Sequence, residues 1–155
     1  MPKTIDVRVA SGILYGLYKA IYEIAGTSAP AIMRRAAPDI LAELHELGVD
    51  FTGVNSIEKL EDQLKDTMVR SGCCDNMTFK LQGNELRADI TNCSFFPLTS
   101  ALGEKGIPPF GCPFAALTLA VAEKNLGKKA RVKHLAPVEG GKPGDTVLVV
   151  ELHDK

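Results

Sequence analysis

The stretch Met77-Thr78-Phe79-Lys80-Leu81-Gln82-Gly83-Asn84-Glu85-Leu86-Arg87-Ala88-Asp89-Ile90 decides the fold, because it predicts two strands joined by a tight turn. Apolar and polar residues alternate on both sides of Gln82–Glu85, which is the pattern of strands that bury one face. Gly83 and Asn84 are residue types that a two-residue hairpin turn favours. The sequence therefore predicts an antiparallel hairpin in which Gln82 faces Glu85.

Extending that pairing places Cys74 opposite Cys93. Directly opposed residues have Cβ atoms about 4.5–5.5 Å apart, so two thiols that are distant in the sequence become neighbours. A one-residue bulge would put Cys73 there instead. Cys112 directly precedes Pro113, which opens a predicted helix, and the amides and dipole at a helix N-terminus favour a thiolate. We therefore expect the functional site between Cys73 and Cys112.

The four cysteines leave three interpretations open. Three or four sulfur atoms around one point would suit tetrahedral zinc or an iron–sulfur cluster, with Cys73, Cys74, Cys93 and Cys112 as the ligands. His134, on a predicted strand, is the best further ligand candidate, although a single strand histidine is more often structural. Otherwise the thiols are inert core residues, as free cysteines commonly are, or Cys74 and Cys93 form a redox pair.

Helical and strand patterns flank the hairpin and predict an α+β fold of one domain covering residues 1–155. Pro38 should kink or split the second helix, because it removes a backbone donor. The Gly- and Pro-rich connection Pro97–Gly111 is long enough to suggest a functional loop. The order of elements predicts an antiparallel sheet with helices packed on it. The expected elements are helices at 9–25, 27–47 and from about 56, the hairpin, a helix at 113–127, and a second hairpin with strands at 130–135 and 146–152.

The composition excludes several classes of partner. The chain of 155 residues has a formal net charge of −1 and 45% hydrophobic residues. A near-neutral chain offers no general attraction to phosphates or anionic lipids, which argues against nucleic acid and membrane-surface partners. Met1–Arg8 carries charges where a signal peptide needs an apolar run, and no apolar stretch reaches the roughly 20 residues that span a bilayer. We therefore expect a soluble, cytoplasmic protein with reduced cysteines.

Four of the six phenylalanines, Phe95, Phe96, Phe110 and Phe114, bracket the connection between the first hairpin and the following helix. They predict either a pocket for a small apolar molecule beneath that connection or a solid core, two interpretations that the sequence does not separate. No general acid–base pair and no nicotinamide or flavin fingerprint stands out, so the sequence leaves catalysis open.

Two segments carry a resemblance to a known family. The succession Asn92-Cys93-Ser94-Phe95, followed by Phe110-Gly111-Cys112-Pro113-Phe114 before an alanine-rich helix, resembles the 4-vinyl reductase domain family. The run Leu126–Val132 and the strand after Gly144-Asp145 also agree with it, so the resemblance covers about Cys73 to Leu152. That family is described as predicted small-molecule or hydrocarbon-binding proteins. The order of elements is also similar to that of the small subunits of the transport-protein-particle tethering complex.

The resemblance implies a zinc site near an effector pocket. Some sensor domains of aromatic-responsive regulators in that family use a cysteine at the start of the fourth helix and two in the last hairpin. Cys112 matches the first of these, whereas the last hairpin here has no cysteine and His134 lies near where one would fall. Our first hypothesis is therefore a module that binds a small apolar molecule, a metal or both, and forms a homodimer through its N-terminal helices. The alternatives are a zinc or iron–sulfur enzyme or accessory subunit, and a protein-interaction scaffold.

Overall fold

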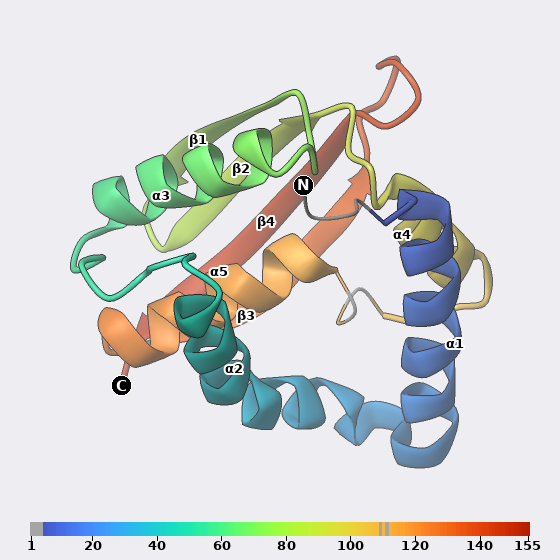
Figure 1. Cartoon of the computed structure of the whole chain (residues 1–155), viewed down its shortest axis with the longest axis horizontal. Helices are drawn as coiled ribbons and strands as arrows, with labels where there is room; N and C mark the ends of the chain where they lie inside the picture. Colours follow the sequence, from blue (N-terminus) through green and yellow to red (C-terminus); the bar gives the residue numbers. More distant parts are fainter. Residues whose placement is uncertain (1–4, 109, 111) are drawn as a thin grey trace.

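The computed structural model of the chain describes residues 5–108, 110 and 112–155. It confirms the α+β class, with an antiparallel sheet and helices packed on it (Figure 1). The elements are α1 (Val7–Ala25), a short 3-10 turn η1 (Gly26–Ser28), α2 (Ala29–Glu46), α3 (Ile57–Arg70), β1 (Asn76–Gln82), β2 (Glu85–Thr91), α4 (Phe96–Glu104), α5 (Pro113–Asn125), β3 (Lys128–Pro137) and β4 (Thr146–Asp154).

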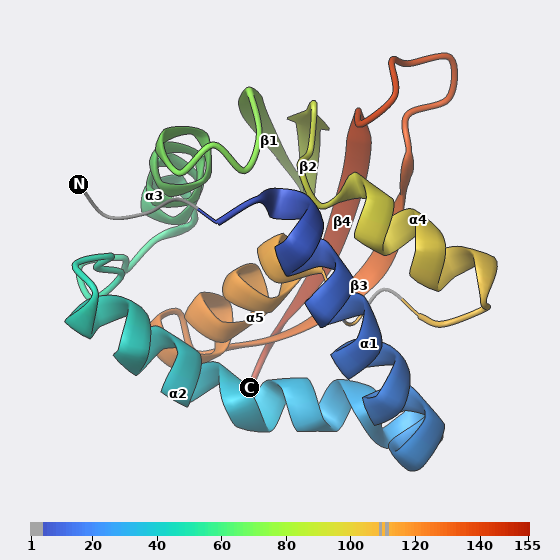
Figure 2. The same ribbon diagram turned by 45° about the vertical axis from the view of Figure 1, so that its right-hand side comes forward.

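The sheet has the strand order β1-β2-β4-β3, with every neighbouring pair antiparallel. In the first hairpin Gln82 pairs with Glu85 and Asn76 with Thr91, so the predicted register is confirmed. The second hairpin places its later strand, β4, beside β2. Helices α3 and α5 lie on the same side of this sheet (Figure 2). The main core fills the space between them and the strands.

Side-chain caps fix the start of α1 and α3, whereas Ser28, a predicted cap of the second helix, makes no capping hydrogen bond. The Asp6 carboxylate accepts a hydrogen bond from the Arg8 amide at 2.8 Å and caps α1. The Ser56 hydroxyl accepts one from the Lys59 amide at 3.3 Å and caps α3. These side chains satisfy amides that have no partner within the helix. Pro38 does not split α2, which is continuous from Ala29 to Glu46 but changes direction along its length (Figure 1).

The prediction of a long loop after Pro97 was wrong, because Phe96–Glu104 forms the helix α4. Pro97 occupies the first turn, where its missing amide costs no helical hydrogen bond. Leu98 and Leu102, four residues apart, are both buried. Tertiary burial of this short apolar face therefore outweighs the Gly and Pro content that predicted a loop. Pro109 and Gly111 lie outside the described residues.

A second, smaller apolar cluster joins α1 to α4. Leu98 and Leu102 pack there with Tyr18 of α1 and with Phe110. The Tyr18 ring meets the Phe110 ring edge-on at a centroid distance of 5.8 Å, and Tyr22 stacks on Phe110 at 6.3 Å. Aromatic pairs favour these two geometries. This cluster holds α1 at one side of the molecule, away from the sheet (Figure 1). Among the described helices, none has the length and apolar character needed to cross a membrane.

Candidate functional site

The four cysteines gather where the first hairpin, α4 and α5 meet. Cys74, Cys93 and Cys112 are buried in the main core, and half-buried Cys73 packs against it. The Ser94 amide donates a hydrogen bond to the Cys73 carbonyl at 2.8 Å, so the strand pairing continues beyond the end of β2. Asn92, with φ of 51°, interrupts the ladder between these points. The hairpin therefore brings the Cys73–Cys74 pair beside Cys93, as the register predicted.

Burial favours the neutral thiol at Cys74, Cys93 and Cys112. Burial, followed by the proximity of Cys93, raises the pKa of Cys74 to about 11. Burial raises the pKa of Cys112 to about 12, although the amides of Ala115 and Phe114 at the start of α5 oppose this rise. Burial also raises the pKa of Cys93, against the opposing effect of the amides at the start of α4. A buried thiolate lacks solvation, and the amides at the two helix N-termini do not compensate for it.

The arrangement does not fit a metal ion as the side chains lie. Within residues 5–108, 110 and 112–155, no group of three or more His, Cys, Asp or Glu side chains comes together closely enough to hold one. The structure thus brings the predicted cysteines into one region without forming a coordination site.

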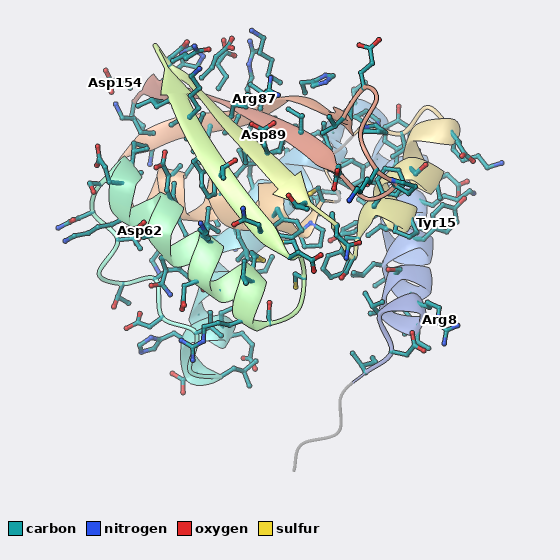
Figure 3. The ribbon with its side chains drawn as sticks, turned by 90° about the horizontal axis from the view of Figure 1, so that it is seen from above. Arg8, Tyr15, Asp62, Arg87, Asp89 and Asp154 are labelled. Atoms are coloured by element: carbon teal, nitrogen blue, oxygen red, sulfur yellow. The ribbon has the colours of Figure 1, made fainter. Side chains whose placement is uncertain are left out.

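His134 lies apart from the cysteines. A bulge between Val132 and His134 shifts the register of β3, so that His134 pairs with Val149. Val149 in turn pairs with Arg87, whose side chain lies on the solvent face of the sheet with that of Asp89 (Figure 3). His134 is exposed on this face, whereas Cys74, Cys93 and Cys112 are in the core on the other. The structure does not bring His134 to the sulfur atoms.

The four predicted ligand-binding phenylalanines separate into three environments. Phe114 is fully buried, and its ring meets that of Phe95 edge-on at 6.3 Å within the main core. Phe96 lines a separate pocket of about 230 Å³ between α4 and the end of β3. Phe110 lines a different and mostly apolar pocket. Phe95 and Phe114 therefore fill the core. Of the four predicted residues, Phe110 lines the mostly apolar pocket described below.

This cavity, which we call the α2–α5 pocket, has a volume of about 250 Å³. It lies between α2, α5, β3 and the segment after α4. Small-molecule pockets are mainly apolar with a few polar groups and span roughly 300–1,000 Å³, so the volume of this one lies just below that range. Its lining residues are Pro30, Met33, Arg34, Ala37, Pro108, Phe110, Ala116, Leu119, Glu123, Arg131 and Val132.

Charged side chains form one part of the lining. Arg34 Nε lies 3.7 Å from Glu123 Oε1, and Arg34 Nη2 donates a hydrogen bond to the Ala130 carbonyl at 3.4 Å. The Arg131 guanidinium pairs with Glu151. The side chains of Arg34 and Arg131 are about half or more exposed, so they mark the side of the pocket that opens to solvent. The remaining lining is apolar.

Sequence reasoning missed most of this pocket. Pro30, Met33, Arg34 and Ala37 come from α2, and they recur at spacings of three and four along one helix face. That periodicity predicts an inward-facing stripe but does not distinguish a pocket wall from a packed core. The pocket depends on how α2 lies against α5, and local pattern carries no signal for this.

Comparison with known proteins identifies the family. A family model described as "Putative rubredoxin C-terminal domain" matches residues 10–145. An uncharacterized protein from Methanocaldococcus jannaschii is 23% identical over 116 residues, which cover 74% of this chain and 70% of that protein. Neither comparison supports the resemblance to 4-vinyl reductase domains or to the tethering-complex subunits. Because the family model spans far more than half of the chain, the chain belongs to the "Putative rubredoxin C-terminal domain" family.

Proposed function

We propose that this domain binds a small, mainly apolar molecule in the α2–α5 pocket. The observation that supports the proposal is the pocket itself, a cavity of about 250 Å³ with largely apolar walls and charged groups at its open side. Binding of an apolar ligand in such a cavity is favourable, because it removes apolar surface from contact with water. Met33 is an unbranched and flexible lining residue that can adapt to ligand shape.

The resemblance to 4-vinyl reductase domains agrees with this proposal, because that family is described as predicted small-molecule or hydrocarbon-binding proteins. The pocket also lies partly beneath the segment after α4, since Pro108 and Phe110 contribute to its wall. The sequence left two interpretations open for this part of the chain, an apolar pocket or a solid core, and this proposal takes the first. The ligand class follows from the lining: an apolar body that fills the interior, with any polar group directed toward Arg34 and Arg131.

The test is an NMR titration of the full chain with octanol. We expect amide shifts at Ala37, Ala116, Leu119 and Val132, which line the pocket. Ala116→Phe places a ring in the cavity and should abolish these shifts. Ala31→Phe is a matched control, because Ala31 is exposed on α2 and does not line the pocket.

Binding that persists unchanged in Ala116→Phe would contradict the proposal, as would the absence of any octanol-dependent shift in the original chain. Replacing octanol with octanoate then tests the charged rim. If Arg34 and Arg131 recognise a polar group, octanoate should bind more tightly than octanol, and Arg34→Ala should reduce that difference.

Metal binding by the cysteines is a second candidate. Two observations favour it: the hairpin, α4 and α5 bring four thiols into one region, and the family description names a rubredoxin. Zinc and iron both suit sets of sulfur ligands. Cys73, Cys74, Cys93 and Cys112 would have to lose protons and rotate to bind either metal. Placing His134 in the same site would require a larger change, because it lies on the other face of the sheet.

Metal analysis of anaerobically purified protein tests this second candidate. It predicts about one equivalent of zinc or iron that is lost in Cys112→Ser. A metal content well below one equivalent that is unaffected by Cys112→Ser would exclude it. The α2–α5 pocket contains no cysteine, so the outcome of this test does not affect the first proposal.

We also propose a homodimer formed through α1. Its outward side carries four large apolar side chains: Val9, Ile13, Leu17 and Ile24, which are 54%, 57%, 55% and 88% exposed. Gly16 beside this face has open space around it, which allows a second helix to approach closely. An exposed apolar face can pair with its own copy. The mass in solution should be that of a dimer, and Leu17→Glu should convert it to a monomer; a monomeric original chain would exclude this assembly.

A further inference from the structure

A second groove lies between α1 and α4, on a different part of the molecule from the α2–α5 pocket. It has a volume of about 300 Å³ and shares no lining residue with that pocket. Its walls are mostly apolar. They consist of Val7, Gly12 and Tyr15 from α1 and Pro97, Leu98 and Ala101 from α4.

Ser11 of α1 gives this groove a polar feature. Ser11 is one of the lining residues, and it is only 9% exposed. Among the described residues, the Ser11 hydroxyl oxygen is the one buried side-chain oxygen or nitrogen without a hydrogen-bond partner. Buried hydroxyl groups in folded proteins are nearly always paired, so an unpaired one requires an explanation. A helical serine often bonds to the carbonyl four residues earlier, and Ser11 does not.

The other polar groups along the groove are already engaged. The Ser94 hydroxyl donates a hydrogen bond to the Gly72 carbonyl at 3.0 Å. The Arg8 guanidinium pairs with the Asp6 carboxylate, with Nη2 2.6 Å from Oδ2. Tyr15 of α1 is partly buried, and it packs against the smaller apolar cluster. Ser11 is therefore the group with unused hydrogen-bonding capacity on the buried side of this groove.

We propose that the α1–α4 groove is a second binding site, for a neutral molecule with an apolar body and one hydroxyl or carbonyl group that hydrogen-bonds to Ser11 Oγ. The apolar walls select the body, and the buried hydroxyl selects the polar group. A charged ligand is disfavoured because no free charge faces it on the buried side. This site goes beyond the proposed function, because it involves neither the α2–α5 pocket nor the cysteines.

The test compares benzyl alcohol with ethylbenzene, in which a methyl group replaces the hydroxyl. Amide shifts of the full chain at Ser11, Gly12 and Ala101 report binding. Benzyl alcohol should bind more tightly than ethylbenzene by about three- to tenfold, the gain from one neutral hydrogen bond. Ser11→Ala should remove this preference while both probes still bind. Ser94→Ala is the matched control in the same groove, and it should keep the preference.

Two further variants make each outcome decisive. Gly12→Leu should block both probes, because the space around Gly12 is open and leucine favours a helix. Ala116→Phe blocks the α2–α5 pocket. If this variant still prefers benzyl alcohol to ethylbenzene, the preference belongs to the α1–α4 groove. No binding at these amides, equal affinity for the two probes, or a preference retained in Ser11→Ala would overturn the proposal. Each of these results leaves the octanol test of the proposed function unaffected.

Discussion

Arg34 of α2 and Glu123 of α5 face each other across the open side of the α2–α5 pocket, with 3.7 Å between Nε and Oε1. Arg34 Nη2 also donates to the Ala130 carbonyl, at 3.4 Å. One guanidinium therefore connects α2, α5 and β3 at the entrance to the candidate ligand site. Both contacts are long, and the Arg34 side chain is about half exposed, so this group can turn toward a ligand at low cost.

We expect the Arg34–Glu123 pair to contribute little to stability. Partly exposed ion pairs contribute about 0–1 kcal/mol, because water screens the charges. Arg34→Ala, Glu123→Gln and the double variant should give a coupling free energy below about 1 kcal/mol in urea unfolding. A coupling of several kcal/mol would show instead that the pair holds α2 against α5, and Arg34 would then not be free to meet a ligand.

The thiols should react in two stages. Cys73 is half-buried and its sulfur accepts a hydrogen bond from the Ser71 hydroxyl at 3.2 Å, whereas Cys74, Cys93 and Cys112 are buried. With dithionitrobenzoate, Cys73 should react quickly and the other three only on unfolding, since reaction requires an accessible thiolate. Cys73→Ser should remove the fast phase alone. Rapid reaction of two or more thiols in the folded protein would contradict the buried arrangement.

Stability should fall as the pH rises above about 8.5. Burial raises the pKa of Cys112 to about 12 in the folded state, so the unfolded thiol loses its proton first. The stabilisation is complete below the unfolded pKa, near 8.5, and is lost as the pH rises toward the folded value. The free energy of unfolding should therefore decrease by up to about 1.4 kcal/mol per pH unit from this one group. Urea unfolding at pH 7.5, 8.5 and 9.5 with reductant measures the slope. Cys112→Ala should reduce it, and the remaining slope belongs to Cys74 and Cys93, whose pKa burial also raises. Equal slopes in both proteins would contradict the assignment.

Gly144 should tolerate a side chain less well than Gly140. Both have positive φ, 95° and 71°, which disfavours alanine at either position. A Cβ at Gly144 would also lie 3.3 Å from the Asn92 Cα, and the Gly144 carbonyl accepts a hydrogen bond from the Cys93 amide at 2.8 Å. A Cβ at Gly140 meets nothing within 4 Å. Thermal unfolding should show that Gly144→Ala is destabilised by about 1 kcal/mol more than Gly140→Ala. Equal effects would mean that the contact with Asn92 relaxes freely.

The sequence by itself determined the elements whose causes are local. Gly83 and Asn84 set the turn, and alternation on either side fixed which residues of β1 and β2 pair, because shifting the register by one would expose the buried face. The same pairing, extended beyond the strand ends, brings Cys73 and Cys74 beside Cys93. Ser56 caps α3 through an amide only three residues away. Each of these interactions acts between residues that are neighbours in the chain or are joined by one short turn.

Tertiary structure alone decided the rest. Phe96–Glu104 is a helix because Leu98 and Leu102 are buried against Tyr18, about 80 residues earlier in the chain, and this burial outweighs local propensity. A bulge in β3 turned His134 away from the cysteines, and the sequence contains no sign of where a ladder will shift. The α2–α5 pocket joins Arg34 to Glu123, and the α1–α4 groove leaves Ser11 unpaired. Cavities are the space that packing leaves between distant segments, so they are a property of the assembled fold and not of any one stretch of sequence.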